Sequence, residues 1–147
     1  MCGIIGLVSD QEVSSTLLEG LKRLEYRGYD SSGIATINAN KIERVRSKGN
    51  LSFLEEKLSN TNLPGNIGVG HTRWATHGTP DEKNAHPHIT DKVAVVHNGI
   101  IENNNQIRNQ LIESGVEFSS DTDTEVICHV LTTYLNSGLS AYDSIRA

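Results

Sequence analysis

The sequence has only two cysteines, Cys2 and Cys128, so it offers no disulfide framework of the kind that small secreted domains use. It has no run of about 20 apolar residues, which a membrane-spanning helix requires. It also lacks a basic N-terminal region followed by an apolar core, as a secretory signal has. The net charge is only −5, and the acidic residues are spread along the chain. We therefore expect a soluble, cytoplasmic protein that binds neither nucleic acid nor an anionic membrane surface.

A chain of 147 residues is long enough for one domain with a core and too short for two comfortable ones. No linker or internal repeat divides it, so residues 1–147 are expected to belong to one domain. The last helix signal, Ser140-Ala141-Tyr142-Asp143, lies so close to the chain end that only a marginal helix fits. This predicts that the domain is truncated at its C-terminus.

Apolar spacing, together with capping and turn residues, predicts mixed α and β structure. The expected strands are residues 3–9, 31–38, 41–47, 67–72 and 92–97. Capping signals of the form Ser/Thr-x-x-Glu at residues 9–12, 52–55 and 122–125 predict three helix starts, and another helix is expected to end at Ser114. Residues 73–91 are polar, rich in His and Pro, and too long for an idle connection, which favours a functional loop.

The first six residues, Met1-Cys2-Gly3-Ile4-Ile5-Gly6, place a cysteine directly after the initiator methionine. Once Met1 is removed, Cys2 carries a thiol and a free α-amine, whose ordinary pKa values are about 8.5 and roughly 7.7–8.0. The amine can take the thiol proton, so one residue supplies both a nucleophile and its base. If Met1 stays, the Cys2 nitrogen is an amide and cannot act as a base. The alternative interpretation is an ordinary small residue at the start of a strand.

Residues 70–78 gather a guanidinium, an indole, two hydroxyls and two imidazoles at the end of an expected strand. Arg73 suits a carboxylate, because its fork of N–H donors matches two oxygens. Trp74 is suited to covering a bound ligand and excluding water. The alternative is a surface loop with a salt bridge and a packed indole.

The pair Asn98-Gly99 follows the expected strand at residues 92–97. The Asn side-chain amide and the Gly backbone N–H are two donors that can converge on one oxygen, as in an oxyanion hole. Asn-Gly is also the commonest tight-turn pair, so a simple turn is the alternative.

Asp123 stands at the front of an expected helix, where a carboxylate either stabilises the helix start or faces a ligand ammonium group. Five histidines, His71, His77, His86, His88 and His97, suggest a metal by number, but their spacing matches no common metal-binding motif. Cys128, beside the apolar stripe of a helix, is expected to be a packed and inert thiol.

Taken together, these stretches resemble the class II, or N-terminal-nucleophile, glutamine amidotransferases, and within them the glutaminase domain of the isomerising glutamine–fructose-6-phosphate aminotransferase family. The resemblance is carried by residues 1–6, 24–31, 71–78, 84–88, 96–103 and 122–125. It implies an α+β fold, the four-layer αββα sandwich with mainly antiparallel sheets, here an incomplete portion.

The resemblance implies a role for each matching residue. Cys2 is the nucleophile, with its own amine as base, and Asn98 and Gly99 hold the oxyanion. The far end of L-glutamine is bound by a cation and an anion, Arg73 on its carboxylate and Asp123 on its ammonium. Trp74, Thr76 and His77 shape the pocket. The assignment uses no cofactor and no metal.

The same resemblance implies hydrolysis of the glutamine side-chain amide through a γ-glutamyl thioester. In the whole enzyme of that family, ammonia passes to a sugar-phosphate isomerase domain, which is absent here, and the enzyme is a homodimer. Two alternatives remain at this stage. One is an inactive truncated fragment that at most binds glutamine, and the other is a metal protein built on the histidines.

Overall fold

The computed structural model describes residues 2–75 and 79–147. The main sheet is antiparallel with the strand order β1-β4-β2-β3, and a second antiparallel sheet pairs β5 with β6. The strands are β1 (Gly3–Val8), β2 (Ser31–Asn38), β3 (Lys41–Lys48), β4 (Ile67–Arg73), β5 (His88–Ile89) and β6 (Ala94–Val95). The helices are α1 (Ser14–Arg23), α2 (Leu51–Asn60), α3 (Asn104–Glu113), α4 (Thr124–Asn136) and α5 (Ala141–Arg146), with 3-10 turns η1 (Glu25–Arg27) and η2 (Glu82–Asn84).

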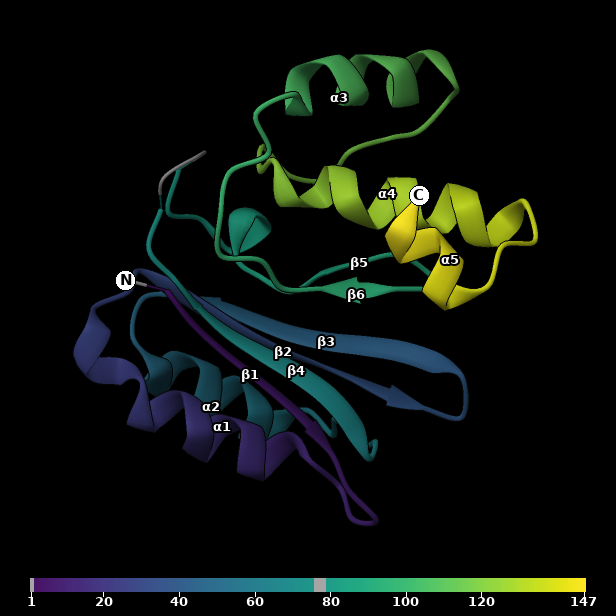
Figure 1. Cartoon of the computed structure of the whole chain (residues 1–147). Helices are drawn as coiled ribbons and strands as arrows, with labels where there is room; N and C mark the ends of the chain where they lie inside the picture. Colours follow the sequence, from purple (N-terminus) through teal and green to yellow (C-terminus); the bar gives the residue numbers. More distant parts are fainter. Residues whose placement is uncertain (1, 76–78) are drawn as a thin grey trace.

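These elements stack in layers (Figure 1). Helices α1 and α2 cover one face of the main sheet, and the β5–β6 sheet lies on its other face. Helix α4 packs on β5 and β6, with α3 and α5 against it. The order is the α-β-β-α order that the resemblance implies, with a second sheet of two short strands. In the described part of the chain, no helix is long and apolar enough to cross a bilayer.

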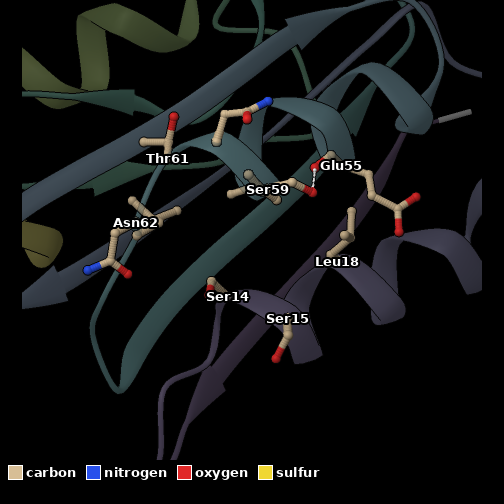
Figure 2. A pocket seen from close by; sticks show the side chains of 10 residues that line it. Ser14, Ser15, Leu18, Glu55, Ser59, Thr61 and Asn62 are labelled. Atoms are coloured by element: carbon tan, nitrogen blue, oxygen red, sulfur yellow. Dashed lines mark hydrogen bonds between the residues drawn. The ribbon is translucent and has the colours of Figure 1, made fainter.

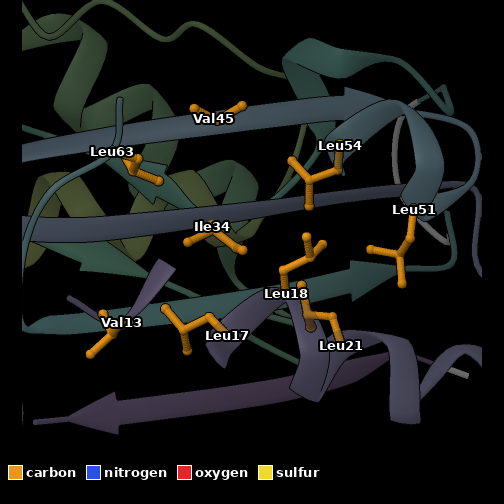
Figure 3. Packing of buried hydrophobic residues seen from close by; sticks show 9 residues of the cluster. All are labelled: Val13, Leu17, Leu18, Leu21, Ile34, Val45, Leu51, Leu54 and Leu63. Carbon is orange, nitrogen blue, oxygen red and sulfur yellow. The ribbon is translucent and has the colours of Figure 1, made fainter. Parts of the chain in front are cut away.

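The apolar core lies between the main sheet and helices α1 and α2 (Figure 3). Its buried members are Val13, Leu17, Leu18, Leu21, Ile34, Val45, Leu51, Leu54 and Leu63. Full burial of one such side chain stabilises the fold by about 1.5–3 kcal/mol. Ile5 and Leu7 of β1 pack against the same cluster, so the core also holds the N-terminal strand.

The start of α1 differs from the expectation. The Ser9 hydroxyl accepts a hydrogen bond from the Gln11 N–H, and the helix begins only at Ser14. The Ser9 and Val13 N–H groups donate to carbonyls of residues 66 and 65, which precede β4. The expected capping box is therefore absent, because the Ser9 N–H that it would use donates to the Asn66 carbonyl and the Ser9 hydroxyl accepts from Gln11.

Two other helix starts also differ. The Asn50 side chain, not Ser52, caps α2 by accepting from the Ser52 N–H. Helix α4 begins at Thr124, and the Glu125 carboxylate accepts from Ser119 and Ser120 in place of the predicted capping bond. In both places the side chain that was expected to cap the helix is hydrogen-bonded to a residue outside the capping motif, which the spacing rule did not consider.

The expected strand at residues 92–97 is reduced to Ala94–Val95. The Thr90 hydroxyl accepts from the N–H groups of Lys92 and Val93, which closes a tight turn. The ladder then has two residue pairs, His88↔Val95 and Ile89↔Ala94. The length of this strand was overestimated because apolar residues indicate burial, but they do not show which residues pair with a neighbouring strand.

The interior between the two sheets is polar. The His86 ring contacts those of His71 on β4 and His88 on β5, with ring centroids 4.2 and 4.8 Å apart. All three are buried. Burial lowers the pKa of His71 to about 4 and that of His88 to about 3, and it also lowers the pKa of His86. These imidazoles are therefore neutral at pH 7.

Gly33 of β2 lies close to the segment that precedes β5. A Cβ there would overlap the His86 carbonyl oxygen and lie 3.0 Å from the Val45 carbonyl oxygen. We expect Gly33→Ala to lower the free energy of unfolding by about 1–3 kcal/mol, because backbone atoms cannot move aside as a side chain can. Urea denaturation measures this change. The matched control is Gly6→Ala in β1, where the nearest atom lies 4.0 Å away and the change should be neutral or stabilising.

The buried histidines predict a pH dependence of stability. An unfolded histidine has a pKa near 6.5, whereas His71 and His88 have pKa values of about 4 and 3 in the fold. The unfolded chain therefore binds more protons below pH 6.5, and the free energy of unfolding falls as the pH drops from about 6.5 toward 4. The slope is about 1.4 kcal/mol per pH unit for each histidine. Urea midpoints that stay constant from pH 7 to pH 5 would contradict this expectation.

Candidate active site

The β1–β4 pairing brings Cys2 to the end of β4. Gly3 pairs with Thr72, and its N–H donates to the Thr72 hydroxyl at 3.0 Å. The next residue back, Cys2, then has its sulfur 3.2 Å from the backbone N–H of Trp74, which donates to it. A thiol at the chain start is thus held beside a backbone donor.

Asp30 fixes the backbone that supplies this donor. Its own N–H donates to the Arg73 carbonyl at 2.8 Å, and its carboxylate accepts from the Ala75 N–H at 2.6 Å. The Arg73 carbonyl and the Trp74 N–H belong to one peptide group, so a bond at the carbonyl also polarises the N–H. Sequence reasoning gave Asp30 no individual role, although it lies in one of the matching stretches.

Arg73 and Trp74 leave the end of β4 in different environments. Arg73 is 4% exposed, and its Nη1 donates to the Thr79 carbonyl at 3.3 Å. Trp74 is 54% exposed, and its ring passes over Gly28, where a Cβ would lie 3.3 Å from the indole. The two remaining predicted pocket residues, Thr76 and His77, lie outside the described residues.

Asn98 and Gly99 do not form a hairpin turn. They follow β6 in an exposed loop that leads to α3, and no strand succeeds them there. The Asn98 Oδ1 lies 2.7 Å from the buried Nε2 of His71 on β4. Gly99 lies against the ring of His97, where a Cβ would be 2.6 Å from Nε2. The sequence alternative of a simple turn is therefore wrong.

Asp123 is 5% exposed and occupies the position before α4. Its side chain makes no capping bond to its own helix, and Oδ2 instead accepts from the Ile101 N–H at 2.8 Å. His97 is tied to the same helix start, since its Nδ1 lies 3.2 Å from the Thr124 hydroxyl. The loop that carries Asn98 and Gly99 is thus joined to the start of α4 on both sides of the pair, to Thr124 before it and to Asp123 after it.

A buried polar network supports the turn before Asp123. Glu125 accepts hydrogen bonds from Ser119 and Ser120, and the Thr122 hydroxyl lies 2.9 Å from the His88 Nε2. Burial would raise the pKa of Glu125, but these hydrogen bonds outweigh it and the pKa lies below its ordinary value. Glu125 therefore acts as a charged acceptor that fixes this turn.

The described candidates are linked by contacts that run from the end of β4 to the start of α4. Cys2 contacts Trp74, Asn98 contacts His71, and the Asn98 loop is bonded to Asp123. The arrangement combines a thiol, a loop amide, a buried cation and a buried carboxylate. Such a set can bind a substrate with two opposite charges at one end and an electrophilic carbon at the other.

Other candidates lie apart from this site. Cys128 is fully buried in α4, and burial raises its pKa to about 12, which fits the expected inert thiol. Among residues 2–75 and 79–147, no group of three or more His, Cys, Asp or Glu side chains is arranged to hold a metal ion. An open groove of about 490 Å³ between α1 and α2 contains none of the predicted site residues (Figure 2).

Sequence comparison identifies relatives of the chain. Residues 58–146 match the family described as a glutamine amidotransferase domain. A glutamine–fructose-6-phosphate aminotransferase (isomerizing) of Bartonella henselae is 58% identical over 146 residues, which cover 99% of this chain and 24% of the relative. One from Rhizobium meliloti is 55% identical over 147 residues, covering 100% of this chain and 24% of the relative. The chain thus spans about a quarter of the length of these curated relatives.

Solved structures show the same architecture. Glutamine phosphoribosylpyrophosphate amidotransferase from B. subtilis, in complex with ADP and GMP, matches with a TM-score of 0.77 and 27% identity over 99% of this chain and 31% of that one. The allosteric regulatory enzyme of purine biosynthesis matches with a TM-score of 0.78, also at 27% identity, over 99% of this chain and 32% of its own. The fold is therefore an incomplete form of the N-terminal-nucleophile amidotransferase fold. By its sequence and its architecture, the chain belongs to the glutamine amidotransferase domain family.

Proposed function

We propose that this chain is the glutamine-hydrolysing part of a glucosamine-6-phosphate synthase, and that Cys2 is its nucleophile. The observation that carries the proposal is the 3.2 Å contact between the Trp74 N–H and the Cys2 sulfur, at the strand end that also holds Asn98. A thiolate next to amide donors matches the needs of amide hydrolysis through a thioester.

The proposed reaction begins when the free α-amine of Cys2 takes the thiol proton. The sulfur attacks the side-chain amide carbon of L-glutamine, and the oxygen becomes an oxyanion held by the Asn98 side-chain amide and the Gly99 N–H. The oxyanion collapses, the C–N bond breaks, and the proton on the α-amine goes to the leaving nitrogen as ammonia departs. Water then attacks the γ-glutamyl thioester, which releases glutamate and restores the thiol.

The charged end of glutamine is assigned to Arg73 and Asp123, which bind the α-carboxylate and the α-ammonium. Both residues are buried, at 4% and 5% exposed, so a charged ligand group there would be shielded from water. Trp74, Thr76 and His77 are proposed to shape the pocket around the substrate.

The wider activity is proposed from the relatives, whose name joins glutamine to fructose 6-phosphate. Ammonia from this site would pass to a sugar-phosphate isomerase domain that converts fructose 6-phosphate into glucosamine 6-phosphate, within a homodimer. We place the enzyme in the cytoplasm, because a thiol nucleophile must stay reduced and cytosolic thiols do.

Covalent labelling tests the nucleophile. A diazoketone analogue of glutamine should add one equivalent to Cys2 in chain whose Met1 is shown by intact mass to be removed. Cys2→Ala should abolish the labelling, because only this sulfur has an adjacent amine and the Trp74 donor. Peptide mass spectrometry locates the adduct.

Cys128→Ala is the matched control, since Cys128 is the second of the two cysteines and is fully buried. It should label at the unaltered rate. An adduct that persists in Cys2→Ala would contradict the assignment, whereas labelling at Cys2 without glutamate release would favour a fragment that only binds glutamine.

The charged end of the site gives a second test. In a Cys2→Ala background, which prevents turnover, Asp123→Asn should weaken glutamine binding about tenfold to a hundredfold, because a hydrogen bond to a charged group contributes about 1.5–3 kcal/mol. The asparagine oxygen can still accept from the Ile101 N–H, so the local backbone is kept. Calorimetry measures the dissociation constant.

Asp121→Asn provides the comparison for that experiment. Asp121 is an exposed aspartate paired with Lys83, two residues before Asp123. Its substitution should change glutamine affinity by less than about twofold. Equal affinity losses in the two variants would contradict the assignment of Asp123 to the substrate ammonium.

A further inference from the structure

The orientation of the Asn98 side chain decides what that residue can do. A side-chain amide carries one acceptor oxygen and one NH₂ donor group, and these exchange places when the amide turns over. With the NH₂ toward the substrate, Asn98 stabilises an oxyanion. With the amide oxygen toward the substrate, Asn98 repels an oxyanion. An exposed asparagine in a loop has no intrinsic preference between the two orientations, so some other group must set it.

His71 is the group in contact with the Asn98 oxygen, at 2.7 Å from its Nε2 to Oδ1. Since Oδ1 can only accept, the Nε2 must carry the hydrogen in this bond. Burial lowers the pKa of His71 to about 4, so the ring is neutral and has a single N–H. That hydrogen is used on the Asn98 oxygen, which leaves the amide NH₂ available on the other side.

The position of His71 is itself rigid. It is fully buried in β4, which is hydrogen-bonded on both sides by β1 and β2. Its ring packs against that of His86, with centroids 4.2 Å apart and the ring planes tilted by 54°. The loop with Asn98 is exposed, whereas the histidine that it contacts belongs to an interior strand of the main sheet.

We propose that His71 is a positioning residue, which holds Asn98 Oδ1 through its Nε2–H and so keeps the Asn98 amide donor turned toward the oxyanion. The inference rests on the proposed function, because the oxyanion is that of the glutamine reaction. It assigns His71 no contact with substrate. Its effect is on the chemical step, since the charged end of glutamine is bound elsewhere.

Steady-state kinetics of glutamine hydrolysis test the proposal in chain with Met1 removed. His71→Leu should lower kcat about a hundredfold, near the loss seen when one oxyanion donor is removed, and should leave KM within about threefold. His71→Gln should keep kcat within about fivefold, because its side-chain NH₂ can replace the Nε2–H donor. A structural defect alone would affect both variants and would also lower the melting temperature.

His86→Leu is the matched control, as His86 is also buried, packs against His71, and neither of its ring nitrogens has a hydrogen-bond partner among the described residues. It should keep kcat within about threefold. A His71→Leu variant with unaltered kcat, or a His71→Gln variant as slow as His71→Leu, would overturn the proposal. Turnover lost in Cys2→Ala but kept in His71→Leu contradicts this inference alone, whereas turnover kept in Cys2→Ala contradicts the proposed function.

A spectroscopic readout does not depend on turnover. In ¹⁵N-labelled chain at pH 7, His71 should show a protonated Nε2 and a bare Nδ1, with the signals assigned through their loss in His71→Gln. Observation of the Nδ1–H tautomer would mean that Nε2 accepts from Asn98, and the amide would then be turned the wrong way. That result would overturn the proposal whether or not the variants fold well and turn over glutamine.

Discussion

The pairing of β1 with β4 is the constraint on which the rest of the site depends. Chain ends usually fray, yet the candidate nucleophile is the second residue. The ladder from Gly3↔Thr72 to Val8↔Ile67 fixes the register, and Ile5 and Leu7 anchor β1 in the core. The Cys2 sulfur therefore lies beside the Trp74 N–H because of hydrogen bonds and apolar contacts several residues away.

Strand β4 serves both layers because its side chains alternate between two faces. A Cβ on Gly70 would meet Ile5 and Leu21 on the apolar side, whereas His71 points toward the polar interior between the sheets. Burying polar groups without partners costs free energy, and a neutral imidazole costs less than a charged one. The interior between the two sheets, next to the candidate site, is therefore polar. The apolar core on the other face of the main sheet, under α1 and α2, stabilises the fold.

The site is assembled by short links between segments far apart in the sequence. His71 and Asn98 are separated by 27 residues, and Ile101 and Asp123 by 22. Each link joins an ordered element, β4 or the start of α4, to the exposed loop between β6 and α3. Because the loop is bonded to ordered elements, its residues can have the defined orientations that a catalytic site requires.

The architecture also bears on how much of the family fold is represented. Relatives and solved structures match nearly all of this chain, but the chain covers only a quarter to a third of them. Within the described residues, the main sheet and its two covering helices form an apolar core, whereas the second sheet has only two short strands. Within the described residues, the main sheet with α1 and α2 therefore has the larger sheet and the apolar core.

The sequence by itself predicted candidate residues for the chemistry and located most elements. The Cys2 start, the Arg73–Trp74 loop, Asn98-Gly99 and Asp123 were all identifiable, because residue type and local spacing are written in the chain. The helix starts near Ser9, Ser52 and Thr122, and the length of β6, were predicted wrongly. Their backbone groups bond to residues that a local rule does not see.

Only the tertiary structure decided the role of Asp30 under the Trp74 peptide and of His71 beside Asn98. These contacts depend on strand register and on the stacking of two sheets, which fix distances between residues that local periodicity leaves independent.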